Sequence, residues 1–225
     1  MIPVAREDYR ASLEQLRADV ESMAETVLTQ LRQALSALAD GDETVARAVI
    51  EGDDAVNDRY LDLEGDCVDL LALQQPVASD LRFVVASFKI ITDLERVGDL
   101  TTNFARYATA EDPGALSGVD VREIGEVVRE QLRAAVDAYV AGDAEACRAI
   151  AGRDDEVDAL CQRASEAVVR ELIAGEADAW DVERLLDDVS RVLLTVRDLE
   201  RVGDHAVNVA ARTLYMVEDD PGLVY

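Results

Sequence analysis

Asp93-Leu-Glu-Arg-Val-Gly-Asp99 is repeated unchanged later in the chain as Asp198-Leu-Glu-Arg-Val-Gly-Asp204. Shorter matches precede both copies in the same order, and they include Gly41-Asp42 with Gly142-Asp143 and Asp53-Asp54 with Asp154-Asp155. Matches that keep their order along both halves indicate a duplicated structural unit. A turn at Pro113-Gly114 separates the halves, so we expect two repeats, residues 1–112 and 113–225.

Each repeat is predicted to contain three long helices. Apolar residues recur three and four positions apart, as Leu13, Leu16 and Val20 do, which is the spacing of one face of an α-helix. Glycine followed by aspartate, as at Gly41-Asp42, ends one helix and caps the next. We expect an all-α fold of two antiparallel three-helix bundles, built from six long helices near residues 5–39, 43–73, 77–110, 119–141, 144–174 and 180–217.

The charge of the chain excludes whole classes of partner. Its 225 residues include 48 Asp and Glu against 22 Lys and Arg, a formal net charge of −26, so nucleic-acid binding is not expected. Lys89 is the only lysine, and acid excess with so little lysine is typical of a salt-adapted haloarchaeal protein, because molar salt screens self-repulsion. The sequence shows neither a secretory signal nor an apolar run of about 18 residues. We therefore expect a cytoplasmic protein that does not insert into the membrane.

Carboxylates spaced one helical turn apart are the candidate site residues. Glu95 with Asp99 and Glu200 with Asp204 flank the apolar stripe of their helices, so they should lie where a neighbouring helix packs. A hard divalent cation such as magnesium, calcium, manganese or iron would offset the repulsion within each pair. In so acidic a chain the pairs are alternatively plain solvated surface. The preceding helix of each repeat offers further oxygen ligands, at Asp53 with Asn57 and at Asp154 with Asp158.

The other residues of the repeated segment have simpler interpretations. Gly98 and Gly203 are expected to allow close packing of helices, and Arg96 and Arg201 to pair with nearby acids. His205 is the only histidine, which excludes the Glu-x-x-His pairs of di-iron bundles and two-histidine zinc hydrolases. We expect His205 at a helix interface or on the surface rather than on a metal.

Three segments together resemble the PhoU family of phosphate-uptake regulators: Ile50-Glu-Gly-Asp-x-x-Val-Asn57, Gln75-Pro-Val-Ala-Ser-Asp-Leu-Arg82 and Asp93–Asp99. The resemblance covers the whole chain, and it implies two three-helix bundles and a homodimer. It also implies a divalent or trivalent metal, such as iron, zinc, manganese or magnesium, at E/D-x-x-x-D motifs. Those motifs fall on Glu95, Asp99, Glu200 and Asp204, with Asp53, Asn57, Asp154 and Asp158 as partners.

The resemblance implies a function without enzymatic activity. A PhoU-like protein is an adaptor that restrains phosphate uptake by contacting the ATPase of a phosphate ABC transporter, and often a sensor kinase. Two departures stand out: residues 180–187 replace the Pro-x-x-Ser-Asp-Leu-Arg segment in the second repeat, and Asn57 makes the first site one charge poorer. The alternative is a metal-free helical accessory protein of another ion transporter. A carboxylate-bridged metal enzyme is a third, weaker hypothesis.

Overall fold

The computed structural model describes residues 3–74, 78–109, 121–174 and 182–223. These residues are almost entirely helical, which confirms the all-α prediction. The helices of the first half are α1 (Pro3–Asp40), α2 (Glu43–Glu51), α3 (Asp53–Gln74) and α4 (Ala78–Ala108). Those of the second half are α5 (Val121–Ala141), α6 (Ala144–Ala151), α7 (Asp154–Ala174) and α8 (Val182–Glu218).

The structure differs from the six predicted helices at one place in each repeat. The predicted helix 43–73 is divided into α2 and α3 at Gly52, and the predicted helix 144–174 is divided into α6 and α7 near Gly152. Asp42 caps α2 by accepting the backbone N–H groups of Thr44 and Val45, and the Gly52 N–H closes its last turn on Ala48. In both repeats, therefore, a short capped helix ends at a glycine and a new helix begins shortly after it.

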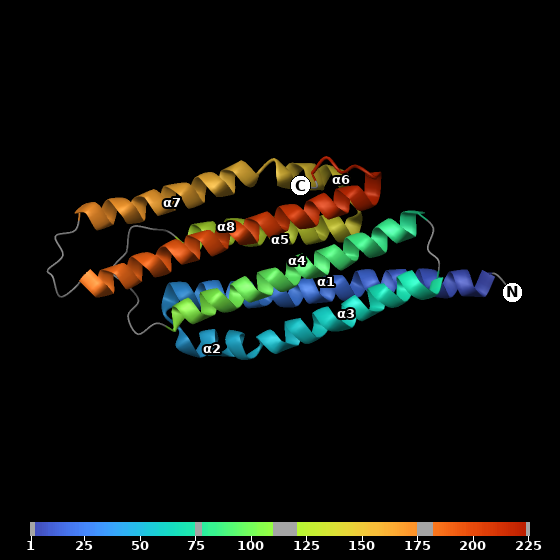
Figure 1. Cartoon of the computed structure of the whole chain (residues 1–225), viewed down its shortest axis with the longest axis horizontal. Coiled ribbons are helices and arrows are strands. Elements are labelled where there is room, and N and C mark those ends of the chain that lie inside the picture. The colour runs from blue at the N-terminus through green and yellow to red at the C-terminus, as the bar shows by residue number, and fades with distance from the viewer. Residues whose placement is uncertain (1–2, 75–77, 110–120, 175–181, 224–225) are drawn as a thin grey trace.

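The two halves lie side by side with their long helices running along the same axis (Figure 1). Within the first half, α4 packs against α1, α2 and α3, and within the second half α8 packs against α5, α6 and α7. Between the halves, α4 packs against α8 and α1 against α5. We call the α4–α8 contact the seam. Both copies of the repeated segment lie on the two helices that form it.

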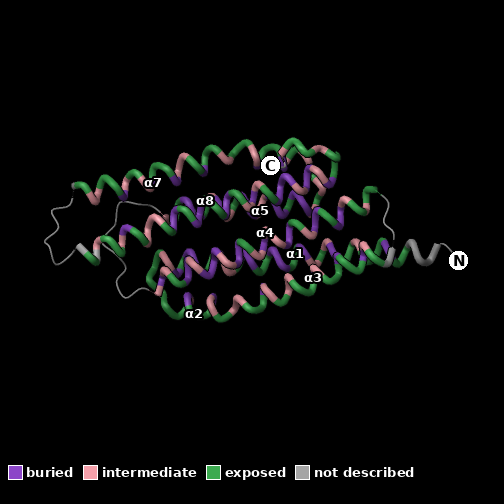
Figure 2. Tube along the Cα trace, in the orientation of Figure 1, coloured by how far each residue is buried: buried purple, intermediate pink, exposed green. Residues whose placement is uncertain are grey.

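One apolar core runs through both halves (Figure 2). Fully buried residues such as Leu63, Ile91 and Leu94 of the first half belong to the same cluster as Leu132 and Leu199 of the second. The seam is therefore an internal packing surface rather than a loose contact between domains. The predicted boundary between residues 112 and 113 lies outside the described residues.

Gly98 and Gly203 occupy equivalent positions of close helix packing, as the sequence predicts. A Cβ on Gly98 would lie 3.2 Å from Val56 Cγ1 on α3, and a Cβ on Gly203 would lie 3.2 Å from Val157 Cγ1 on α7. The duplicated glycines thus let α3 approach α4, and α7 approach α8, to the same degree. This close approach brings the predicted carboxylates of each helix pair near one another. None of the described helices is both long and apolar enough to cross a bilayer.

Candidate functional site

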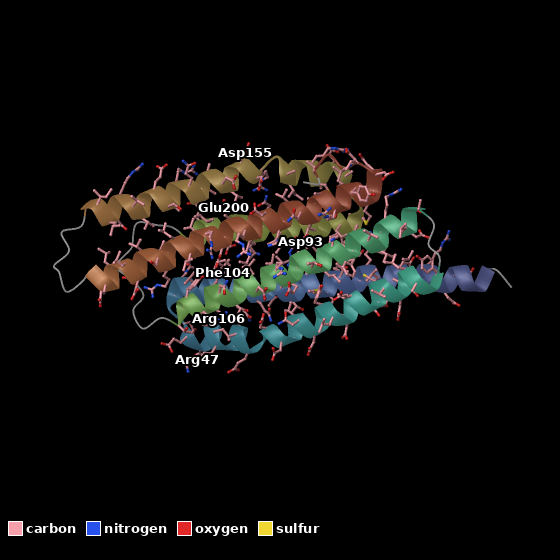
Figure 3. All side chains as sticks on the ribbon, in the orientation of Figure 1. Arg47, Asp93, Phe104, Arg106, Asp155 and Glu200 are labelled. Carbon is pink, nitrogen blue, oxygen red and sulfur yellow. The ribbon has the colours of Figure 1, made fainter. Side chains whose placement is uncertain are left out.

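The structure brings the four predicted residues of the second repeat to one face of the α7–α8 pair. Burial raises the pKa of Asp154, and Asp158 and Asp204 raise it further. The pKa of Glu200 is raised by desolvation and then by the same two carboxylates. Asp204 behaves likewise: desolvation and Asp158 raise its pKa, while His205 and Arg201 oppose the rise. The carboxylates therefore act on one another across the two helices, and Figure 3 shows Glu200 on α8 beneath α7.

A cysteine lies under this second carboxylate set. Cys161 is buried on α7, and burial followed by the charges of Glu200, Asp158 and Asp204 raises the pKa of its thiol to about 12. The thiol is therefore neutral at physiological pH. Glu200, Asp158 and Asp204 thus all lie within electrostatic range of the Cys161 thiol.

The first repeat arranges its carboxylates in the same places but with cations among them. Burial raises the pKa of Glu95, Asp99 and Asp53 add to the rise, and Arg96 and His205 counteract it. The Arg96 guanidinium lies 3.6 Å from both Glu95 Oε2 and Asp99 Oδ2, as predicted for an arginine paired with nearby acids. Asn57 replaces the fourth carboxylate. This set is thus both poorer in acids and partly neutralised.

The donor chemistry of the second set fits a hard divalent cation, because carboxylate oxygens are what such ions bind. Among the described residues, however, no three His, Cys, Asp or Glu side chains converge closely enough to hold an ion. The structure therefore places the predicted residues in two sets without gathering either set around one point. Metal binding stays a prediction.

Sequence reasoning missed the role of the first aspartate of each repeated segment. Asp198 is completely buried at the seam, where Tyr107 Oη donates to its Oδ2 at 3.0 Å and Asn103 Nδ2 donates to the same atom at 3.3 Å. Asp93 accepts a hydrogen bond from Asn208 Nδ2 at 3.3 Å, and its Oδ1 lies 2.9 Å from His205 Nδ1. His205 thus lies at a helix interface, in line with the prediction.

The seam contacts form a reciprocal exchange between the repeats. Asn103 of the first half bonds Asp198 of the second, and Asn208 of the second half bonds Asp93 of the first. Asn103 and Asn208 follow their copies of the repeated segment at the same spacing. From the sequence this spacing predicts that Asn103 and Asn208 extend each carboxylate pair by one helical turn, but it does not predict their contacts with Asp198 and Asp93 across the seam.

A pocket of about 330 Å³ opens where α3, α4 and α8 meet. It lies beside the first carboxylate set, and its walls include arginines from both repeats. Arg201 reaches it from α8, while its guanidinium lies 3.7 Å from Asp198 Oδ1. Arg106, labelled in Figure 3, was not singled out from the sequence. The lining residues are Asp53, Arg96, Asp99, Leu100, Thr102, Asn103, Arg106 and Arg201.

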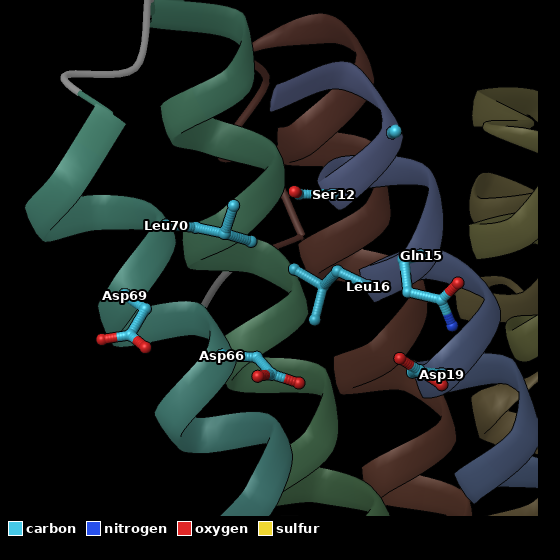
Figure 4. A pocket seen from close by; sticks show the side chains of 8 residues that line it. Ser12, Gln15, Leu16, Asp19, Asp66, Asp69 and Leu70 are labelled. Atoms are coloured by element: carbon cyan, nitrogen blue, oxygen red, sulfur yellow. The ribbon is translucent and has the colours of Figure 1, made fainter. Parts of the chain in front are cut away.

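A second pocket, of about 400 Å³, lies between α1 and α3 (Figure 4). It is lined by Asp19, Asp66 and Asp69 along with the polar Ser12 and Gln15. Arg59 pairs with Asp19 at 2.5 Å at this surface. None of the predicted site residues contributes to it.

Comparison with known proteins gives consistent results along the whole chain. The PhoU domain family matches residues 20–108 and again residues 121–213. A Pseudomonas putida protein named phosphate-specific transport system accessory protein PhoU homolog is 34% identical over 214 residues, covering 94% of this chain and 81% of that protein. A homolog of the same name, numbered 1, from Methanothermobacter thermautotrophicus is 32% identical over 212 residues, covering 93% of this chain and 94% of that protein.

Two solved structures share the fold. The crystal structure of PhoU from Pseudomonas aeruginosa has a TM-score of 0.85 at 33% identity, covering 94% of this chain and all of that one. The phosphate transport system regulatory protein PhoU from Streptococcus pneumoniae has a TM-score of 0.86 at 25% identity, covering 94% of this chain and 98% of that one. The duplicated helices, the repeated segment and these similarities agree, and the chain belongs to the PhoU family.

Proposed function

We propose that this protein is a regulatory accessory protein of a phosphate transport system. The observation that carries the proposal is similarity over nearly the whole chain to proteins named for that role, with both repeats matched by the family. The resemblance of the repeated segment to the same family supports it from the sequence. The protein would act by binding other proteins rather than by catalysis, because the names of its relatives describe accessory and regulatory roles.

In finer terms, the protein would act in the cytoplasm as a homodimer. It would contact the ATPase of a phosphate ABC transporter and restrain uptake when phosphate is ample, and a sensor kinase would be a second partner. These steps follow from the family resemblance of the sequence.

Affinity capture of the tagged protein from its own cells tests the proposal. Capture from phosphate-replete cells should recover transporter components, and deletion of the gene should raise phosphate uptake in replete medium. An unrelated acidic helical protein with the same tag controls for charge-driven capture. Recovery of a different ion transporter, with phosphate uptake unchanged on deletion, would favour the alternative accessory role instead.

We also propose that the second carboxylate set, Asp154, Asp158, Glu200 and Asp204, holds a divalent cation. The raised pKa values of Asp154, Glu200 and Asp204 support the proposal, because after desolvation they are raised by neighbouring carboxylates, Asp158 among them, and a cation would relieve that repulsion. Iron, zinc, manganese and magnesium are the candidates. A bound cation would supply charge neutralisation that stabilises the α7–α8 pair.

Metal analysis of protein purified without chelator tests this second proposal. The double variant E200Q/D204N should lose bound metal, and the matched variant E95Q/D99N should lose much less, because Asn57 and Arg96 already weaken the first set. Metal content that is unchanged in both variants would overturn the proposal and favour a metal-free protein.

A further inference from the structure

The pocket between α3, α4 and α8 has an unusual charge for this chain. Acidic residues outnumber basic ones by 48 to 22 overall, yet the pocket is lined by three arginines against two aspartates. The arginines come from different positions: Arg96 and Arg106 from α4, and Arg201 from α8 of the other repeat. Guanidinium groups that gather in this way are suited to an oxyanion, because each offers several N–H donors in a planar fork.

The two aspartates of the pocket wall already have partners. Thr102 Oγ1 donates to Asp53 Oδ1 at 3.0 Å, and the Arg96 guanidinium lies 3.6 Å from Asp99 Oδ2. Arg106 is exposed, and its Nη1 lies 3.5 Å from Asn103 Oδ1, which is a long hydrogen bond. Arg106 and Arg201 therefore keep donor capacity for a molecule that enters the pocket.

The duplication supplies an internal comparison. When the two repeated segments are aligned, Thr102 corresponds to Val207 and Arg106 corresponds to Ala211. The mirrored position beside the second repeat therefore lacks one hydroxyl and one guanidinium. The basic pocket therefore depends on Thr102 and Arg106, which only the first repeat carries, and not on the shared helix geometry alone.

The pocket is also joined to the seam. Asn103 and Arg201 line it, and both contact Asp198, at 3.3 Å and 3.7 Å. An anion in the pocket would share these two groups with Asp198. Occupancy would therefore alter a contact that holds the two repeats together.

We propose that this pocket binds a phosphate group through Arg96, Arg106 and Arg201. The phosphate group is either free inorganic phosphate or the phosphoryl group of a nucleotide, and both have the same charged tetrahedral oxygens. The role of the bound phosphate group as a signal of phosphate supply rests on the proposed function, since a regulator of phosphate uptake needs a way to sense that supply. Binding at the seam would report that supply to the packing of the repeats.

Titration calorimetry tests the proposal with the full chain in one chloride concentration throughout. Inorganic phosphate, ATP and sulfate are titrated separately, so the two sources of the phosphate group and a general oxyanion are compared. We expect saturable binding of phosphate or ATP, and weaker binding of sulfate. R106A should weaken that binding about tenfold, because one charge-assisted donor is lost.

The control variant is R170A, which removes the same charge from an exposed ion pair on α7 and should leave the affinity unchanged. Circular dichroism shows whether R106A retains its helices, which is expected because Arg106 is exposed. The proposal is overturned if neither phosphate nor ATP binds, if sulfate binds as tightly, or if R106A binds as tightly as the unaltered protein.

The calorimetric result on phosphate binding and the affinity-capture test of the proposed function can fail independently of each other. Tight, Arg106-dependent binding together with failure to capture any transporter component would refute the regulatory role and leave the pocket assigned. Capture of the transporter without phosphate or ATP binding would refute the pocket alone.

Discussion

The carboxylate sets of the two repeats sit at equivalent places on equivalent helices, but the first set has more cationic neighbours than the second. In the first repeat, Arg96 contacts two of the acids and a basic pocket opens beside them. In the second repeat, desolvation and neighbouring carboxylates raise the pKa values of Asp154, Glu200 and Asp204, and only Asp204 has cations, His205 and Arg201, that oppose the rise. The glycine contacts that position the helices are the same in both, at 3.2 Å. The helix packing is therefore the same in both repeats. A few side chains determine whether each copy favours a cation or an anion.

The largest expected effect distinguishes the two seam aspartates. Asp198 is fully buried and holds Tyr107 and Asn103, whereas Asp93 is 15% exposed. D198A should lower the free energy of unfolding by about 3 kcal/mol, because it removes a fully buried carboxylate that accepts hydrogen bonds from Tyr107 and Asn103 and pairs with Arg197 at 2.9 Å. D93A should cost about 1 kcal/mol, since water can reach its partners. Urea unfolding of both variants measures the difference, and equal losses would contradict the asymmetry.

The next effect concerns the one position at which the carboxylate sets differ in charge, Asn57 and Asp158. D158N should weaken manganese binding at the second set about tenfold, because one anionic oxygen ligand is replaced by a neutral one. N57D should strengthen binding at the first set, but by less, because Arg96 remains beside it. Calorimetric titration of manganese into each variant measures both changes. If N57D raises the manganese affinity by a larger factor than D158N lowers it, the arginines beside the first set have little effect on cation binding.

A smaller effect should appear in the pH dependence of stability. The pKa values of Asp154, Glu200 and Asp204 are raised on folding, so just above the ordinary values of 3.8 and 4.5 the folded protein binds more protons than the unfolded chain. This contribution is fully present below those values and is lost as pH rises through the raised ones. The melting temperature of metal-free protein should therefore fall across that window.

The variant E200Q/D204N serves as the control for this pH dependence, because its remaining acids repel one another less. Its melting temperature should fall less steeply with pH than that of the unaltered protein. A cation bound at the second set should oppose the fall, because it binds the deprotonated carboxylates and so stabilises the folded protein more as pH rises. Parallel profiles for both proteins would place the repulsion elsewhere on the surface.

The smallest effect separates the two packing glycines. G98A gains about 1 kcal/mol of helix propensity, which offsets much of the strain against Val56. G203A meets Val157 at the same distance and also lies 3.5 Å from Gln131 Oε1 and 3.9 Å from Val128, so it should be the more destabilising. Thermal melts of both variants measure the difference, and a more stable G203A would contradict it.

Much of the fold could be predicted because its signals are local. The repeated segment, the apolar spacing and the glycine-aspartate pairs each act within a few residues. The division at Gly52 was missed even though Gly52-Asp53 is the same kind of pair as Gly41-Asp42. Apolar residues continue at helical spacing across Gly52, so the pattern predicts one continuous helix where the structure has two.

The candidate site could be predicted only within a single helix. Spacing of one turn predicted that Glu95 and Asp99 share one face of their helix, and on α4 both lie beside Arg96. Contacts between the repeats depend on how α4 and α8 are aligned, which one sequence does not reveal. The burial of Asp198 and the position of Arg201 in the wall of the first repeat's pocket both depend on this alignment of α4 and α8.

The reciprocal bonds of Asn103 and Asn208 have a consequence for how the chain can be divided. Each half holds an aspartate whose amide donor is encoded in the other half. Either half produced as a separate polypeptide would thus be incomplete, and the two fragments should reassociate when mixed. Cutting the chain between α4 and α5 would convert the seam into a bimolecular equilibrium, and the strength with which the halves hold each other could then be read as a dissociation constant.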